Sequence, residues 1–152
     1  MKTQYKSFHD WIFENLKEGS TLLEFGSGPG TIRFTEKYTV YSIEHDIKWV
    51  GHCKRSNYIY APIKNRWYDI SVLQKELPSL QYDMILVDGP TGRIGRKGLL
   101  NNLHLLDTKA KTMVFDDVNR LKEKELMIAV ANKCNKKYVI HTGEDRQFAI
   151  LT

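Results

Sequence analysis

The apolar and polar residues of this chain follow two alternating patterns. Short runs rich in β-branched and aromatic residues recur along it, and longer stretches with apolar residues at helical spacing separate them. Glycine or proline closes several of these segments. The pattern predicts strands over residues 21–25, 39–45, 57–63, 82–88, 111–115, 137–142 and 147–152. It predicts helices over residues 8–16, 31–38, 47–55, 70–77, 98–106 and 119–132.

The order of these segments predicts an open α/β sheet. Crossovers between parallel strands are right-handed, which places helices on both faces of the sheet. Only residues 143–145 separate the last two strands, so these two must be antiparallel neighbours. We therefore expect a doubly wound, Rossmann-like α/β fold with seven strands, mostly parallel, that ends in a C-terminal antiparallel hairpin.

Length and composition favour one cytoplasmic domain. The chain has 152 residues, 41% of them apolar and 27% charged, and no internal repeat, so we expect a single domain over residues 1–152. No apolar run approaches the roughly 20 residues that span a bilayer, and residues 1–6 lack the apolar block of a signal peptide. We expect no membrane partner. Cys53 and Cys134 form no CxxC pair, which favours reduced thiols in a cytosolic protein.

The net charge of +5 suits an anionic partner. That partner could be nucleic acid or a small acidic molecule. Because the basic residues are scattered along the chain, charge alone does not favour nucleic acid, which stays a possible partner.

The segment after the first strand carries the strongest chemical signal. In open α/β sheets, ligands bind beyond the carboxyl ends of the strands, and Glu24–Thr31 reads Glu-Phe-Gly-Ser-Gly-Pro-Gly-Thr at such an end. Alternating glycines let the chain turn sharply and let a ligand approach the backbone. Glu44 ends the second strand, where a carboxylate can accept both hydroxyls of a ribose.

These residues resemble the first motif and the second-strand acid of class I S-adenosylmethionine-dependent methyltransferases. The order of elements resembles that family's fold over essentially the whole chain. The resemblance implies a cofactor whose methionine part lies over the glycine-rich turn, with Glu24 near its amino end. It implies that residues after the second and third strands lie near the ribose and adenine, although Tyr68 could equally be a packing residue. The implied cofactor-binding residues are Glu24, Gly26, Ser27, Gly28, Gly30, Thr31, Glu44, His45, Asp46, Tyr68 and Asp69.

Two phosphate-binding motifs fit less well. A dinucleotide fingerprint needs glycine at the sixth position from Gly26, where this chain has Thr31, and Glu24 would repel a diphosphate. The basic, glycine-rich segment 89–97 contains no Gly-Lys-Ser/Thr. A dinucleotide-binding or non-catalytic domain with this sheet topology stays open, because a fold alone does not determine function.

Three aspartates at strand ends are the candidate catalytic residues. Asp88 ends the fourth strand, beside the expected methyl group, where it could act as a general base or a metal ligand. Asp116 and Asp117 end the fifth strand. Metal-dependent small-molecule O-methyltransferases resemble this set, except that Asp117 stands where they have Asn. Three carboxylates would suit Mg²⁺ or Ca²⁺. Alternatively, one of the pair caps the helix that begins near residue 119.

Arginines near the same strand ends suggest an acceptor. Arg93, Arg96 and Arg120 could bind its carboxylate or phosphate groups. Residues 58–63, 67–69 and 87–90 together resemble a group that includes saccharide O-methyltransferases. We therefore expect O-methylation of a small acceptor, for which anionic and sugar-like molecules are candidates. The alternative is an RNA or DNA methyltransferase, although Asp-Gly-Pro-Thr at 88–91 differs from the Asn/Asp-Pro-Pro-aromatic motif of amino-methylating enzymes. The chain is short for this fold, so a partner chain, such as a second copy, could complete the acceptor site.

Overall fold

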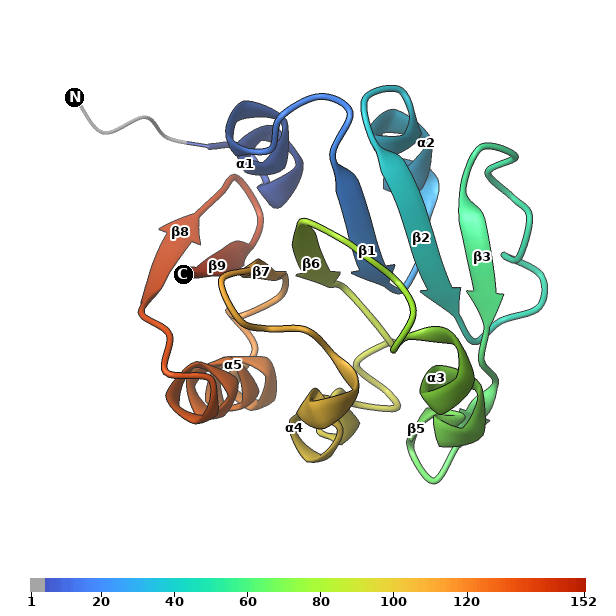
Figure 1. Cartoon of the computed structure of the whole chain (residues 1–152). Helices are drawn as coiled ribbons and strands as arrows, with labels where there is room; N and C mark the ends of the chain where they lie inside the picture. The colour runs from blue at the N-terminus through green and yellow to red at the C-terminus, as the bar shows by residue number, and fades with distance from the viewer. Residues whose placement is uncertain (1–4) are drawn as a thin grey trace.

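A computed structural model describes residues 5–152 of the chain. Seven strands form one sheet in the order β3-β2-β1-β6-β7-β9-β8 (Figure 1). Strand β9 runs antiparallel to both β7 and β8, whereas the pairs from β3 to β7 are parallel. The seven strands are β1 (Thr21–Phe25), β2 (Thr39–Glu44), β3 (Asn57–Tyr60), β6 (Met84–Val87), β7 (Thr112–Phe115), β8 (Tyr138–Thr142) and β9 (Gln147–Leu151). The predicted fold class is confirmed.

Helices cover both faces of this sheet (Figure 1). One apolar core lies under α1 (Phe8–Asn15) and α2 (Pro29–Thr35). The other lies under α3 (Ile70–Glu76), α4 (Gly98–Asn101) and α5 (Leu121–Lys133). Successive side chains of a strand point to opposite faces, so Leu22 packs in the first core and Leu23 in the second. This two-sided burial explains why all four residues of β6 are apolar and buried.

The helix predicted over residues 47–55 is wrong, because this segment consists of turns and bends. The Asp46 side chain accepts a hydrogen bond from the backbone N–H of Lys48 at 3.0 Å, which starts a turn. Gly51 then has a φ of +81°, outside the helical region. The crossover between β2 and β3 is therefore a loop.

The predicted strand 57–63 is wrong at its end, because β3 stops at Tyr60. A small separate hairpin follows, formed by β4 (Ile63–Lys64) and β5 (Trp67–Tyr68). Its two turn residues, Asn65 and Arg66, have φ values of +55° and +62°, as in the primed turns that match the twist of a hairpin. The hairpin buries Trp67 and Tyr68 in the second core.

The crossover between β6 and β7 also differs from the prediction. The helix expected over 98–106 is divided into α4 and a 3₁₀ turn, Leu103–Leu105. The last helix begins at Leu121 rather than near residue 119, because the backbone of Arg120 is still extended.

Two further expectations concern the chain as a whole. Cys53 and Cys134 are free thiols. Within residues 5–152, no helix combines the length and the apolar character needed to cross a membrane.

Candidate active site

The loops that follow β1 and β6 touch backbone to backbone. A Cβ added to Gly26 would lie 2.9 Å from the Cα of Gly89, and one added to Gly89 would lie 2.8 Å from the Cα of Gly26. Gly26 also has a φ of +88°, which favours glycine. The two glycines therefore bring the glycine-rich turn beside Asp88.

The other two glycines of the turn have different surroundings. A Cβ on Gly30 would collide with Nε2 of His9 in α1, so Gly30 allows helix α1 to pack. Nothing lies within 4 Å of a Cβ placed on Gly28. Of the predicted cofactor glycines, Gly28 thus faces open space that a ligand can enter, whereas Gly30 contacts protein.

Glu24 and Thr31 lie beneath the turn and are buried. Oε2 of Glu24 accepts hydrogen bonds from Thr31 Oγ1 at 2.7 Å and from Ser42 Oγ at 2.6 Å. Thr31 Oγ1 in turn accepts the backbone N–H of Gly28 at 3.1 Å. Burial raises the pKa of Glu24 to about 7, although the two hydroxyl bonds oppose this shift. Glu24 therefore stabilises the glycine-rich turn through Thr31, which it orients toward the Gly28 backbone.

Glu44 ends β2 on the other side of the turn, and 3% of its surface is exposed. Its Oε1 accepts hydrogen bonds from the backbone N–H of Ser27 at 3.3 Å and from Ser27 Oγ at 2.5 Å. Its Oε2 accepts the backbone N–H of Asp46 at 2.9 Å and lies 3.4 Å from Nδ1 of His45. The hydrogen bonds to this carboxylate all come from neutral donors.

Three buried side-chain polar atoms have no hydrogen-bond partner among the described residues. One is Nε1 of Trp67, and the other two are Nδ1 of His45 and the hydroxyl of Tyr68, whose rings lie close to each other. The two rings are 6.2 Å apart, and the Tyr68 hydroxyl lies 2.7 Å from where a Cβ on Gly89 would be. Burial, and then the charge of Glu44, raise the pKa of Tyr68 well above its ordinary value. Tyr68 is thus a fully buried residue whose hydroxyl faces the loop after β6.

Asp69, also predicted to bind the cofactor, has a local structural role. Its Oδ1 accepts hydrogen bonds from the backbone N–H of Ser71 at 3.0 Å and from Ser71 Oγ at 2.7 Å, which caps helix α3.

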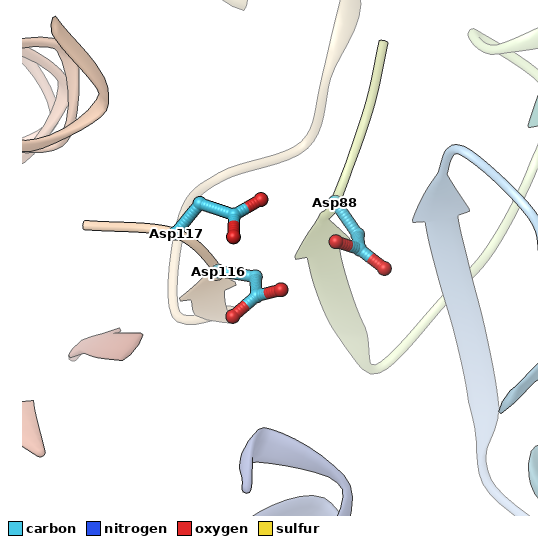
Figure 2. A group of neighbouring side chains, drawn as sticks. All are labelled: Asp88, Asp116 and Asp117. Carbon is cyan, nitrogen blue, oxygen red and sulfur yellow. The ribbon is translucent and has the colours of Figure 1, made fainter. Parts of the chain in front are cut away.

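The three predicted catalytic aspartates come together at the ends of β6 and β7 (Figure 2). Each offers a carboxylate oxygen within 4.8 Å of the others. Burial raises the pKa of Asp88 well above its ordinary value, and the charge of Asp116 adds to this effect. Burial and the charge of Asp117 raise the pKa of Asp116. Asp88 and Asp116 therefore hold protons more tightly than isolated carboxylates do.

Arg96 is 4% exposed and contacts all three aspartates, through the Asp117 carboxylate and the backbone carbonyls of Asp88 and Asp116. Its Nη2 lies 3.0 Å from Oδ2 of Asp117 and donates to the carbonyl of Asp88 at 3.0 Å. Nη1 donates to the carbonyl of Asp116 at 3.2 Å, and Nε donates to the carbonyl of Pro90 at 3.0 Å. The prediction that Arg96 binds an acceptor conflicts with this geometry, because all three nitrogens already donate to protein.

Two more arginines contact the cluster. Nη1 of Arg120 lies 3.6 Å from Oδ2 of Asp117, and this arginine is half exposed. Nη1 of Arg146, just before β9, lies 3.3 Å from Oδ2 of Asp116 and 3.6 Å from Oδ1 of Asp117. The sequence prediction missed Arg146. The antiparallel pairing of β9 with β7 places the start of β9 beside the end of β7, whereas the sequence pattern predicted only that β9 pairs with β8.

The proposed helix-capping role of the aspartates is not observed, since the N-cap residue of α5 is Arg120 and it makes no side-chain cap hydrogen bond. A cavity of about 420 Å³ opens beside Asp116. Residues 6–10, Arg33 and the turn before β9 also line it. Within it, burial and the charge of Arg33 lower the pKa of His9 to about 4, so its imidazole is neutral at pH 7.

Comparison with solved structures places this geometry in a known fold. No protein-family model matches the chain, and no curated protein matches its sequence. The precorrin-6y C5,15-methyltransferase of Geobacter metallireducens matches with a TM-score of 0.64 and 10% identity, over 98% of this chain and 92% of that one. Aeropyrum pernix fibrillarin, with natively bound S-adenosylmethionine, matches with a TM-score of 0.64 and 10% identity, over 90% and 67%. The chain has the fold of the class I S-adenosylmethionine-dependent methyltransferases.

A third solved structure extends this comparison. The MycE methyltransferase of the mycinamycin pathway, in complex with Mg, S-adenosylhomocysteine and mycinamycin VI, matches with a TM-score of 0.57 and 15% identity. The match covers 95% of this chain and 44% of that one. At these identities the likeness is one of fold. In this methyltransferase fold the strand order reverses between β1 and β6, which is where ligands bind in open α/β sheets, and Gly26 and Gly89 meet there.

Proposed function

We propose that this protein is an S-adenosylmethionine-dependent methyltransferase that methylates an oxygen of a small acceptor, either anionic or sugar-like. One observation carries the proposal. The contact between Gly26 and Gly89 joins the glycine-rich turn to Asp88 at the switch point of the sheet. A ligand over the turn would therefore lie beside a carboxylate that can accept a proton.

The residues around the turn fit the cofactor. Gly28 leaves the backbone open, and Glu44 is a carboxylate that no arginine or lysine neutralises within residues 5–152. The Ser27 hydroxyl donates to Glu44 as a ribose hydroxyl would, so we expect Ser27 to turn aside when a ribose binds. When bound, S-adenosylmethionine supplies a methyl group on a cationic sulfur. Gly26, Ser27 and Gly28 would line its methionine part, and His45 and Tyr68 would lie toward its nucleoside.

Asp88 would remove the proton from the acceptor hydroxyl. A general base works best when its pKa lies near the working pH, and burial beside Asp116 moves the pKa of Asp88 in that direction. The remaining catalysis is alignment of the acceptor oxygen, which can contribute much of the rate in a displacement of this kind. Asp116 and Arg146 would position the acceptor, because both line the adjoining cavity.

The cluster favours proton transfer over a bound metal. Two of its three carboxylates already face guanidinium groups. Arg96 lies 3.0 Å from Asp117, Arg120 lies 3.6 Å from Asp117, and Arg146 lies between Asp116 and Asp117. Mg²⁺ between these oxygens would have to displace Arg146 and would lie near the buried charge of Arg96. We therefore propose that Mg²⁺ is not required, although the MycE structure contains Mg. The predicted metal role of Asp88, Asp116 and Asp117 is the less favoured alternative.

A second candidate is methylation of RNA or DNA. It draws support from four neighbouring cations that have no ion-pair partner in the described part of the chain, namely Arg66, Arg93, Lys97 and Lys122. Labelled S-adenosylmethionine incubated with a cell extract separates the two candidates. A small acceptor predicts label in the low-mass filtrate. A nucleic acid predicts label that nuclease treatment releases.

Titration calorimetry tests the cofactor directly. We expect S-adenosylmethionine and S-adenosylhomocysteine to bind at micromolar concentration and NAD not to bind. Glu44→Ala should abolish this binding, whereas Glu125→Ala, which removes an exposed carboxylate from α5, should preserve it. Binding of NAD but not of S-adenosylmethionine would support the dinucleotide-binding alternative.

A further inference from the structure

A second cavity, of about 260 Å³, is lined in part by residues of α4 and α5. Figure 1 shows these two helices on the same side of the sheet. Three segments that are distant in sequence enclose the cavity: the turn between β4 and β5, the loop over residues 92–98, and the first turn of α5. It shares no lining residue with the cavity beside Asp116. The proposed methyl-transfer reaction does not use it.

This second cavity is strongly basic. Arg66, Arg93, Lys97 and Lys122 line it, all four are exposed, and none forms an ion pair with any residue between 5 and 152. Arg96 also lines it, but its charge is matched by Asp117. The lining contains one carboxylate, that of Glu123, which leaves a net charge of about three positive.

The backbone is arranged to gather these cations. Arg66 has a φ of +62°, an uncommon conformation for a residue other than glycine. Gly95 has a φ of +84°, and Gly98 packs directly against the Trp67 side chain, so the glycines shape the loop that carries Arg93 and Lys97. The basic, glycine-rich segment after β6 contains no phosphate-loop motif, but it forms one wall of this cavity and places Arg93 and Lys97 there.

The start of α5 adds hydrogen-bond donors to the cations. The backbone N–H groups of Lys122 and Glu123, two residues that line the cavity, have no acceptor in the part of the chain that the structure describes, and Arg120 provides no side-chain cap. This helix has 13 residues, and unpaired N–H groups at a helix start favour an anion.

We propose that this cavity binds phosphate groups, as a second site separate from the methyl-transfer site. Arginine forks match the oxygens of phosphate, and a phosphate monoester carries roughly two negative charges at neutral pH, against one on a carboxylate. A net charge of about three positive therefore matches a phosphate or diphosphate ester better than a carboxylate. Its volume admits a group of that size.

Calorimetric titration with inorganic pyrophosphate tests this site. The cavity variant carries Arg66→Ser, Arg93→Ser and Lys97→Ser. The matched control carries Lys17→Ser, Lys54→Ser and Lys75→Ser, which remove the same charge from exposed positions outside the cavity. We expect the cavity variant to bind pyrophosphate at least about tenfold more weakly and the control to change less than about twofold. Thermal unfolding of both variants checks that they are folded.

Two results would overturn the proposal: no binding of pyrophosphate at millimolar concentration, or an equal loss in the two variants. A short single-stranded RNA then identifies the source of the phosphate. If it displaces pyrophosphate with a log–log salt slope near about −3, as expected for four phosphate contacts, the ligand is a nucleic acid. If pyrophosphate binds and RNA does not displace it, the ligand is a small phosphate ester. Neither result depends on methyl transfer, so this site and the proposed activity can fail separately.

Discussion

Carboxylates gather at two places along one edge of the sheet, and their partners differ. At the ends of β1 and β2, hydroxyl groups and backbone N–H groups donate to Glu24 and Glu44. At the ends of β6 and β7, three arginines face Asp116 and Asp117, and Asp88 shares their space.

This difference separates two kinds of chemistry. Neutral donors leave the charge of Glu44 unmatched, so it can attract a ligand that carries hydroxyl groups and a positive charge. Guanidinium groups match the charge of the aspartates, while burial and crowding raise the pKa values of Asp88 and Asp116. The first group is therefore suited to binding and the second to proton transfer.

Asp88→Asn would break the second group most severely. The amide cannot take the acceptor proton, so we expect the rate to fall by about 10²–10⁴ with little change in cofactor affinity. Because the pKa of Asp88 is raised, activity of the native protein should increase with pH above the usual carboxylate range. Transfer of labelled methyl groups measures both. Asp83→Asn, at the opposite end of β6, is the control, and an equal loss of rate there would refute the assignment.

Arg96→Met removes the buried guanidinium that binds Asp117 and three backbone carbonyl groups. It leaves the Asp117 carboxylate, 4% exposed, without its closest cation. We expect the free energy of unfolding to fall by about 3–5 kcal/mol, as measured by urea denaturation. Arg93, an exposed arginine of the same loop, provides the control. The substitution Arg93→Met should change the free energy of unfolding by less than about 0.5 kcal/mol. Similar losses in the two variants would contradict the structural role of Arg96.

Glu24→Gln tests the first group through pH. Burial raises the pKa of Glu24 from 4.5 to about 7, so the folded state keeps a proton that the unfolded state loses. Stability should therefore decline between these two pH values and then level off. Between pH 4.5 and about 7, the free energy of unfolding of the glutamine variant should therefore rise, relative to that of the native protein, by on the order of 3 kcal/mol. Urea denaturation at several pH values measures it, and parallel stability curves would show that Glu24 has an ordinary pKa.

Removal of divalent cations should have the smallest effect. Since Arg146 lies between Asp116 and Asp117, we expect EDTA to change the rate by less than about twofold. Arg146→Ala sharpens the test, because loss of that cation should allow Mg²⁺ to raise the melting temperature of the variant. If EDTA abolished the rate of the native protein and Mg²⁺ restored it, the aspartates at the ends of β6 and β7 would be a metal site and not a metal-independent proton-transfer group.

Much of this edge could be predicted from the sequence, because it depends on local patterns. Seven apolar runs predict the strands, and Glu44, Asp88 and Asp116 stand where those strands end. The β4–β5 hairpin could not be predicted in this way, since Asn65 and Arg66 form its turn without the glycine that usually signals one.

The partners of the site residues were harder to predict than the residues themselves. Arg96 is an ordinary basic residue of a glycine-rich loop until the fold encloses it among three carbonyl groups and Asp117. Arg146 reaches Asp116 across 30 residues of sequence, through a strand pairing that no local pattern shows.

A crystal structure grown with S-adenosylhomocysteine and Mg²⁺ tests the central claim most directly. We predict that the homocysteine part lies over Gly28, that a ribose hydroxyl replaces Ser27 on Glu44, that the sulfur faces Asp88, and that Arg146 stays between Asp116 and Asp117. A nucleoside bound elsewhere, or Mg²⁺ held among the three aspartates, would contradict this account.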